Sequence, residues 1–463
     1  MTSQIRVRFA PSPTGSLHLG GVRTALYNYL LAKKENGQFI IRVEDTDLER
    51  NQLEASDKQL ADLKWLGLEW DQGPQKGGDC GPYLQSQRTE LYQEQAELLI
   101  KAGKAFYCFL TDEEQSKLIT HVNRQLKSPY RDMDVQEALV RVKKGEDYAI
   151  RFKNDHTEIF SFKDLIHGET ELKGDMVGDF VLIRSNKLPV YNFCCAIDDH
   201  FMKITHVLRG EEHLSNTLRQ LMLYDVFGWE RPLFGHLSMI LGANRKKLSK
   251  RDDAVSVKDF ISGGYLPEAI LNYVALLGWS AKSAKEKLDL SELIELFSLD
   301  RAHKSPAMFD RDKLNWLNHY YLQKCTPEEI ILALGVMGKS VDKTWFVKFW
   351  MNLSHHFNTL VEVIDALVLF ESYKLVDKEL IIGEGRSVIE AFVRALNDVD
   401  HMDEAVFSNI TKTLMETMGV KGKRLFAPIR VGLIGVQSGI ELKALAKLLS
   451  KEEMLKRLSQ ALS

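Results

Sequence analysis

Residues 5–43, IRVRFAPSPTGSLHLGGVRTALYNYLLAKKENGQFIIRV, determine the fold of the first part of the chain. Residues 5–9 alternate as a strand does, and residues 11–15 carry the Pro and Gly of a turn. The apolar positions that follow with the spacing of one helical stripe are Val22, Ala25, Leu26, Tyr29 and Leu30. Gly37 then marks a helix end before a second strand at 39–43. This order predicts an α/β fold with a Rossmann-like doubly wound parallel sheet, whose ligands bind beyond the carboxyl ends of the strands.

Length and composition exclude several classes of protein. The chain has 463 residues, enough for about three domains, and 44% of its residues are hydrophobic. Its net charge of -3 excludes a uniformly basic nucleic-acid coat, although a local basic face is still compatible with that total. The five cysteines form no C-x-x-C pair, and the start of the chain lacks the apolar core of a secretion signal. We therefore expect a cytoplasmic protein without a membrane span.

The pattern along the chain predicts a sheet domain interrupted by an insertion and followed by helices. The predicted segments are 1–86 and 188–242 for the sheet domain, 87–187 for an inserted α+β subdomain, 243–320 for a first helical region and 321–463 for an all-α region. Further strands are predicted at 148–152, 180–183 and 191–197. Capping boxes at 111–114, 326–329 and 450–453 predict three helix starts.

The stretch His18-Leu19-Gly20-Gly21 lies where a strand gives way to a helix. The unpaired N–H groups and the dipole of a helix start favour an anion, and glycines let a ligand approach the backbone. His18 could then donate a hydrogen bond to a phosphate oxygen. Taken alone, the tetrapeptide is more typical of a capped helix with an incidental histidine.

A second stretch, residues 245–251, has the sequence RKKLSKR. Five basic residues in seven suit a polyphosphate, although an isolated basic run is usually only solvated. The two stretches together, flanking one parallel sheet, are far more specific than either alone.

These motifs resemble the glutamyl-tRNA synthetase family of class I aminoacyl-tRNA synthetases. Residues 18–21 stand where the class has its HIGH motif, and residues 247–251 where it has KMSKS. Other matching stretches are 8–15, 42–47, 198–200, 207–213 and 264–269. The fourth motif position is Gly21 rather than His, a substitution common in the glutamate-specific branch.

The resemblance implies a two-step reaction, in which glutamate and ATP give glutamyl-adenylate and the glutamyl group then passes to the 3′-terminal adenosine of tRNA(Glu). It assigns catalysis to His18 and Lys250, which would stabilise charge on the phosphates. The implied ATP-binding residues are His18, Gly20, Gly21, Glu212, Lys247, Ser249 and Lys250.

The resemblance also implies a glutamate site. A γ-carboxylate needs a fixed cation, and arginine offers a bidentate fork. The implied glutamate-binding residues are Arg8, Ser12, Glu44, Tyr191 and Arg209, with Glu44 meeting the α-amino group. An asparagine that some members have near Tyr191 is Cys195 here, so that contact is not transferred.

We expect one kind of metal ion, the Mg²⁺ that binds together with ATP. Mg²⁺ accompanies ATP without an assigned protein ligand. We predict no structural zinc, because Cys108 stands alone in the stretch where some relatives bind it. The histidines His200, His206 and His213 also lack a ligand spacing and are expected in the core or on the surface.

The resemblance implies three partners, tRNA(Glu), L-glutamate and ATP, and we expect a monomer. The insertion is expected to bind the acceptor end of the tRNA. Region 243–320 is expected to carry the signature loop and contact the stem, and region 321–463 to read the anticodon. Two alternatives stay open. One is a non-discriminating enzyme that also charges tRNA(Gln), and the other is a tRNA-binding paralogue without activity.

The assignment of Lys250 is testable. We expect Lys250→Ala to lower the rate of adenylate formation by a much larger factor than it changes the KM for glutamate, because a cation at the phosphates acts on the transition state. Pre-steady-state adenylate formation measures the rate. An unchanged rate would remove Lys250 from the catalytic residues.

Overall fold

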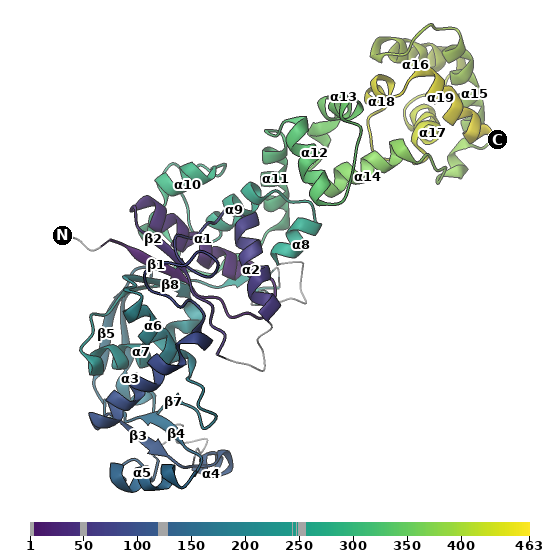
Figure 1. The fold of residues 1–463 in the computed structure, drawn as a ribbon. Helices are drawn as coiled ribbons and strands as arrows, with labels where there is room; N and C mark the ends of the chain where they lie inside the picture. The colour runs from purple at the N-terminus through teal and green to yellow at the C-terminus, as the bar shows by residue number, and fades with distance from the viewer. Residues whose placement is uncertain (1–3, 47–52, 119–127, 243, 247, 249–255) are drawn as a thin grey trace. The chain divides into compact units, whose positions relative to one another are not determined.

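The computed structural model describes residues 4–46, 53–118, 128–242, 244–246, 248 and 256–463, and the chain divides into two compact units (Figure 1). The sheet unit comprises residues 1–259 and 270–310, and the helical unit comprises residues 260–269 and 311–463.

A four-stranded parallel sheet forms the centre of the sheet unit. Its strands, in spatial order, are β2 (Gln38–Ile41), β1 (Arg6–Phe9), β8 (His206–Gly210) and β9 (Leu233–Leu237). The chain runs outward from β1 to β2 on one side and from β8 to β9 on the other. The two neighbouring strands β1 and β8 therefore mark the switch point, beyond whose carboxyl ends doubly wound sheets bind ligands. The predicted parallel α/β sheet is confirmed.

Helix α1 (Leu19–Lys34) connects β1 to β2 and lies against them (Figure 1). All five residues of the predicted stripe are buried, but so is every residue from 25 to 32. The helix is enclosed because later segments cover it: Tyr27 packs edge-on against Phe297 and donates to the Ala275 carbonyl at 3.0 Å. Gly37 follows the helix because a Cβ there would lie 2.4 Å from the Ile5 carbonyl oxygen.

The insertion is built from antiparallel strands and short helices. Strands β3 (Ala105–Cys108), β4 (Ala149–Phe152) and β7 (Val181–Ile183) form one sheet, and β5 (Ile159–Asp164) and β6 (Gly168–Lys173) form a hairpin. Helices of the sheet unit within the insertion are α3 (Thr89–Lys101), α4 (Asp112–Leu118) and α5 (Val135–Lys143). Outside the insertion, this unit also has α2 (Leu53–Trp65), α7 (Leu214–Phe227) and α10 (Leu290–Leu296). The strands predicted at 148–152 and 180–183 are confirmed.

The strand predicted at 191–197 is wrong. This segment is the start of helix α6 (Tyr191–Phe201), in which every residue from 193 to 199 is buried. A helix enclosed on all sides shows no alternation of apolar and polar residues, so its sequence cannot be told from that of a buried strand. The error matters because α6 places Tyr191 and two aspartates at the functional site described below.

The helical unit confirms the predicted all-α region. Its helices are α11 (Arg311–Leu322), α12 (Pro327–Val336), α13 (Lys343–Leu353), α14 (Leu360–Glu371), α15 (Glu384–Asn397), α16 (Glu404–Met418), α17 (Lys423–Ile434), α18 (Leu442–Leu448) and α19 (Lys451–Leu462). Thr326 and Glu329 form the predicted capping box at the start of α12. Two further helices, α8 (Val257–Ser262) and α9 (Pro267–Leu276), cross the division between the units. Among the described helices, none has the length and apolar composition needed to span a bilayer.

One buried cation joins three helices of this unit. Arg457 of α19 donates to the Phe370 carbonyl at 2.7 Å and to the carbonyls of Leu369 and Leu433 at 3.1 Å. Its Nε also donates to Glu453 at 2.8 Å. These carbonyls lie at the carboxyl ends of α14 and α17, where helix dipoles favour a positive charge.

Removing this cation should loosen the carboxyl-terminal helices. We expect Arg457→Met to lower the opening free energy of α19 by about 3 kcal/mol, because three buried carbonyls lose a charged donor. Hydrogen exchange of peptides from residues 442–463 measures it. Lys456→Met is the matched control, since Lys456 is exposed on the same turn; equal effects of the two substitutions would contradict the prediction.

Candidate active site

A cavity of about 710 Å³ opens at the carboxyl ends of the parallel strands. The loops that follow β1, β2 and β8 all contribute to its walls, as expected for a switch point. Nine residues predicted for the site line it together: Arg8, Ser12, His18, Gly20, Gly21, Glu44, Tyr191, Arg209 and Glu212. These residues come from segments up to two hundred positions apart in the chain.

The start of α1 forms one wall of the cavity. His18 is the N-cap residue and is half-buried, and its side chain does not cap the helix. A Cβ on Gly20 would meet no described atom within 4 Å, and one on Gly21 would make only ordinary contacts with Leu17 and Phe9. The protein's own packing therefore does not require these glycines. They keep the helix start open toward the cavity, where unpaired N–H groups favour an anion.

The predicted loop residues Lys247, Ser249 and Lys250 lie outside the described residues. Leu248, the described residue within that loop, lines the cavity, and Ser256, after the loop, forms a backbone bridge with His18.

Arg8 is held by a buried carboxylate at the base of the cavity. Its Nε donates to Asp199 Oδ1 at 3.1 Å, and its Nη2 donates to Oδ2 at 3.3 Å. Burial would raise the pKa of Asp199, but Arg8 and Arg42 lower it to about 2, so the carboxylate is ionised at neutral pH. No described residue accepts a hydrogen bond from Arg8 Nη1.

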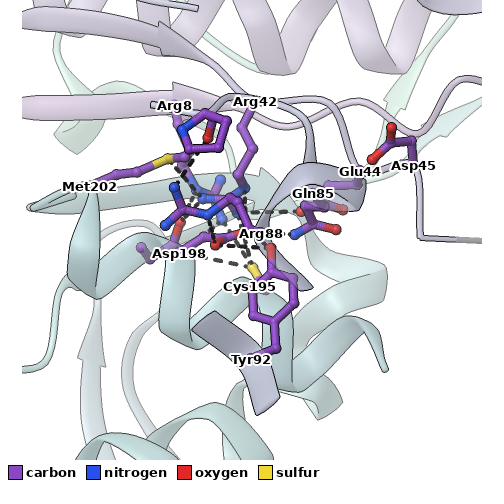
Figure 2. A network of polar contacts seen from close by, with 12 residues as sticks. Arg8, Arg42, Glu44, Asp45, Gln85, Arg88, Tyr92, Cys195, Asp198 and Met202 are labelled. Atoms are coloured by element: carbon purple, nitrogen blue, oxygen red, sulfur yellow. Dashed lines mark hydrogen bonds and ion pairs between the residues drawn. The ribbon is translucent and has the colours of Figure 1, made fainter. Parts of the chain in front are cut away.

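A buried network of ion pairs extends from this contact (Figure 2). Arg42 Nη1 donates to Asp199 at 2.7 Å, and Arg88 Nε donates to Asp198 at 2.6 Å. Tyr92 and Gln85 also donate to Asp198. The charged members are the cations Arg8, Arg42 and Arg88 and the anions Glu44, Asp198 and Asp199. Opposite charges balance, so the whole network can be buried.

Arg209, at the end of β8, is held in the same manner by different partners. Its Nε donates to His236 Nε2 at 3.2 Å, and its Nη2 donates to the Thr217 hydroxyl at 2.7 Å. Its Nη1 is buried and has no hydrogen-bond partner among the described residues. Arg8 and Arg209 thus each bind the protein through Nε and Nη2, and the Nη1 atom of each has no hydrogen-bond partner among the described residues.

Three further groups tune the chemistry of the cavity. Burial raises the pKa of Glu44, although its contact with Arg42 at 3.3 Å opposes the shift. The Tyr191 hydroxyl and His213 Nδ1 share a hydrogen bond of 3.2 Å. Burial, together with the charge of Arg209, lowers the pKa of His213 to about 4, so this imidazole is neutral at pH 7.

The lining as a whole favours an anionic ligand. Arg8, Arg23, Arg184 and Arg209 line the cavity against only two acidic residues, Glu44 and Glu212. Fixed cations in a recess of low dielectric raise the local concentration of negative ligands.

The sequence analysis missed several functional neighbours. It did not single out Arg42 or the acceptor Asp198 as site-supporting residues, nor the contact of His213 with Tyr191. His200 stacks instead on Trp229, and His206 contacts Thr205. Among the described residues, one group has a possible metal-binding arrangement: His355, His356 and Glu441, all exposed and in the helical unit. Cys108 lies beside the Ser128 hydroxyl, and the absence of structural zinc remains a prediction.

Comparison with known proteins agrees with this fold and site. Residues 4–316 match the family "tRNA synthetases class I (E and Q), catalytic domain", and residues 317–462 match "Anticodon binding domain". The class defined by the fold and the site is therefore that of the class I aminoacyl-tRNA ligases, which are enzymes.

The chain belongs, within this class, to the glutamate–tRNA ligase family. It is 43% identical to the glutamate–tRNA ligase of Bdellovibrio bacteriovorus over all of this chain and 99% of that protein. It is 40% identical to that of Halalkalibacterium halodurans over the full length of both. A crystal structure of a glutamate tRNA ligase from Elizabethkingia meningosepticum, in complex with its amino acid, superposes with a TM-score of 0.86 at 32% identity, covering 99% of each chain.

The low pKa of His213 makes stability depend on pH. Above the ordinary value of 6.5 the imidazole is neutral in both states; as the pH falls toward 4, the unfolded chain binds the proton first and folded-state stability is lost. Between pH 7 and pH 5, His213→Gln should therefore lose roughly 1 kcal/mol less unfolding free energy than the parent chain. Urea denaturation at both pH values measures this. The exposed His401→Gln is the control, and a parent-like loss in His213→Gln would disprove the assignment.

Proposed function

We propose that the chain activates L-glutamate with ATP and transfers the glutamyl group to the 3′-terminal adenosine of tRNA(Glu). The observation that carries the proposal is the one cavity in which an open helix start and the two half-bound guanidinium groups of Arg8 and Arg209 lie together. The first feature suits phosphates, and the second suits a carboxylate.

In the first step an α-carboxylate oxygen of glutamate attacks the α-phosphorus of ATP. The new P–O bond forms as the bond to pyrophosphate breaks, and pyrophosphate leaves with the electron pair. The start of α1, with His18, binds the phosphates, and Lys250 adds a positive charge as negative charge shifts to the leaving group. The exposed carboxylate of Glu212 suits Mg²⁺, which prefers oxygen ligands and would neutralise phosphate charge when bound with ATP.

Arg8 and Arg209 bind the glutamate side chain through their Nη1 atoms. Both atoms are donors, so a γ-carboxylate can accept from both, whereas the amide group of glutamine would turn an N–H toward one of them. Glu44 accepts from the α-ammonium group. Tyr191 and Ser12 supply hydroxyl groups at the same wall.

In the second step the 2′-hydroxyl of the terminal adenosine attacks the carbonyl carbon of the adenylate, and AMP leaves. The insertion at 87–187 binds the acceptor end, and region 243–320 carries the signature loop and contacts the stem. Region 321–463 reads the anticodon, which the family match over residues 317–462 supports. The enzyme acts as a cytoplasmic monomer.

ATP–pyrophosphate exchange tests the proposal. Label should enter ATP only when glutamate is present, with tRNA also required, and glutamine should not replace glutamate. A chain that folds but shows no exchange under these conditions would be a tRNA-binding paralogue. Charging of purified tRNA(Glu) and tRNA(Gln) side by side then separates the two enzymatic alternatives: charging of tRNA(Glu) alone supports a discriminating enzyme, and charging of both identifies a non-discriminating one.

A further inference from the structure

A buried carboxylate–imidazole pair stands behind Arg209, outside the cavity lining. His236 of β9 is fully buried, and its Nδ1 lies 2.6 Å from Asp164 Oδ2. Asp164 is the last residue of β5, so this contact joins the inserted hairpin to the central sheet. Neither residue lines the cavity.

The protonation state of this pair follows from its neighbours. The second oxygen of Asp164 accepts from the backbone N–H groups of Ile166 and His167 at 2.8 Å. Burial raises the pKa of Asp164, but these bonds and His236 lower it below its ordinary value. Burial lowers the pKa of His236; Asp164 opposes this shift, Arg209 and His167 add to it, and the pKa stays below its ordinary value, so the imidazole is neutral at pH 7.

A neutral imidazole carries one proton, and the ionised Asp164 takes that proton on Nδ1. Nε2 is then an acceptor: it receives the Nε–H of Arg209 at 3.2 Å, and the Thr217 hydroxyl, which also binds Arg209, lies 3.1 Å from it and can donate to it. In the other tautomer His236 would carry its proton on Nε2, and this N–H would face the Nε–H of Arg209. The position of Arg209 therefore depends on a proton fixed by a residue of a different strand.

We infer that Asp164 and His236 are positioning residues for the amino-acid substrate, because together they fix the guanidinium group of Arg209, whose buried Nη1 has no partner among the described residues and would bind the substrate carboxylate. This inference rests on the proposed function, since it takes glutamate as the ligand of Arg209. The plainer alternative is that the pair only fastens the β5–β6 hairpin to the sheet, where Phe162 also packs against Phe234.

Two substitutions of His236 separate these roles. His236→Asn keeps a donor near the position of Nδ1 for Asp164 but offers no acceptor to Arg209. His236→Gln can offer an amide oxygen near the position of Nε2. We expect the Asn variant to raise the KM for glutamate about tenfold or more and the Gln variant to stay within about threefold of the parent, with the KM for ATP unchanged in both. Equal KM values for glutamate in the two variants would contradict the inference.

A substitution of Asp164 tests the tautomer directly. In Asp164→Asn an amide N–H faces Nδ1, so the imidazole proton moves to Nε2 and opposes Arg209. We expect the KM for glutamate to rise about tenfold or more. In the double variant Asp164→Asn/His236→Gln, the glutamine side chain has no tautomers for residue 164 to select, so the KM for glutamate should return close to that of His236→Gln. Multiplying effects in the double variant would show a merely structural role.

Arg209→Met and His206→Gln complete the experiment, which uses the full chain in glutamate-dependent pyrophosphate exchange with melting temperatures alongside. An unchanged KM for glutamate in Arg209→Met would overturn the proposed glutamate site. A raised KM in Arg209→Met with parent-like values in Asp164→Asn and His236→Asn would overturn the positioning inference alone. His206, on the same strand as Arg209 but away from the cavity, should leave the KM unchanged.

Discussion

The buried pairing of Arg8 and Arg42 with Asp199 is the contact on which the rest of the sheet unit depends. It joins the ends of β1 and β2 to α6, so it connects the first fifty residues to a segment beyond the insertion. Each of these charges would be costly to bury without its partners, and no member can be replaced alone without leaving an unpaired ion. The ion pairs consequently specify how the two parts of the sheet unit meet at the switch point, and the cavity forms directly above them.

The same physical solution occurs twice in the cavity. Arg8 is anchored by a carboxylate and Arg209 by an imidazole and a hydroxyl, and in each case the Nε–Nη2 edge is occupied. A guanidinium anchored along one edge loses its rotational freedom before a ligand arrives, which lowers the entropy cost of binding. The recess thereby presents donors in fixed directions, and fixed donors discriminate between a carboxylate and an amide better than mobile ones do.

The sequence predicted the parallel sheet, the insertion and the helical unit because runs such as 39–43 and the capping box at 326–329 express local preferences. It also predicted nine cavity residues, through motifs that keep fixed spacing within one segment. It could not predict the pairing of Arg42 with Asp199, because that contact spans more than 150 positions and depends on the three-dimensional register of β2 and α6. The helix at 191–201 was predicted as a strand for a related reason, since complete burial removes the periodicity that identifies a helix. A charged residue directly after the apolar run 39–41 was the available signal for Arg42.

Helix α1 is buried along most of its length, and its first turn lines the cavity. Its sides are fixed by bonds from Tyr27 to the Ala275 carbonyl and from Arg23 to the Leu277 carbonyl. The end of α1 at the cavity is therefore fixed to the core of the sheet unit, and any motion that closes the cavity has to come from other segments. On heating, ATP binding should consequently be lost at the same temperature at which the sheet unit unfolds, and no folded state without ATP binding should precede unfolding.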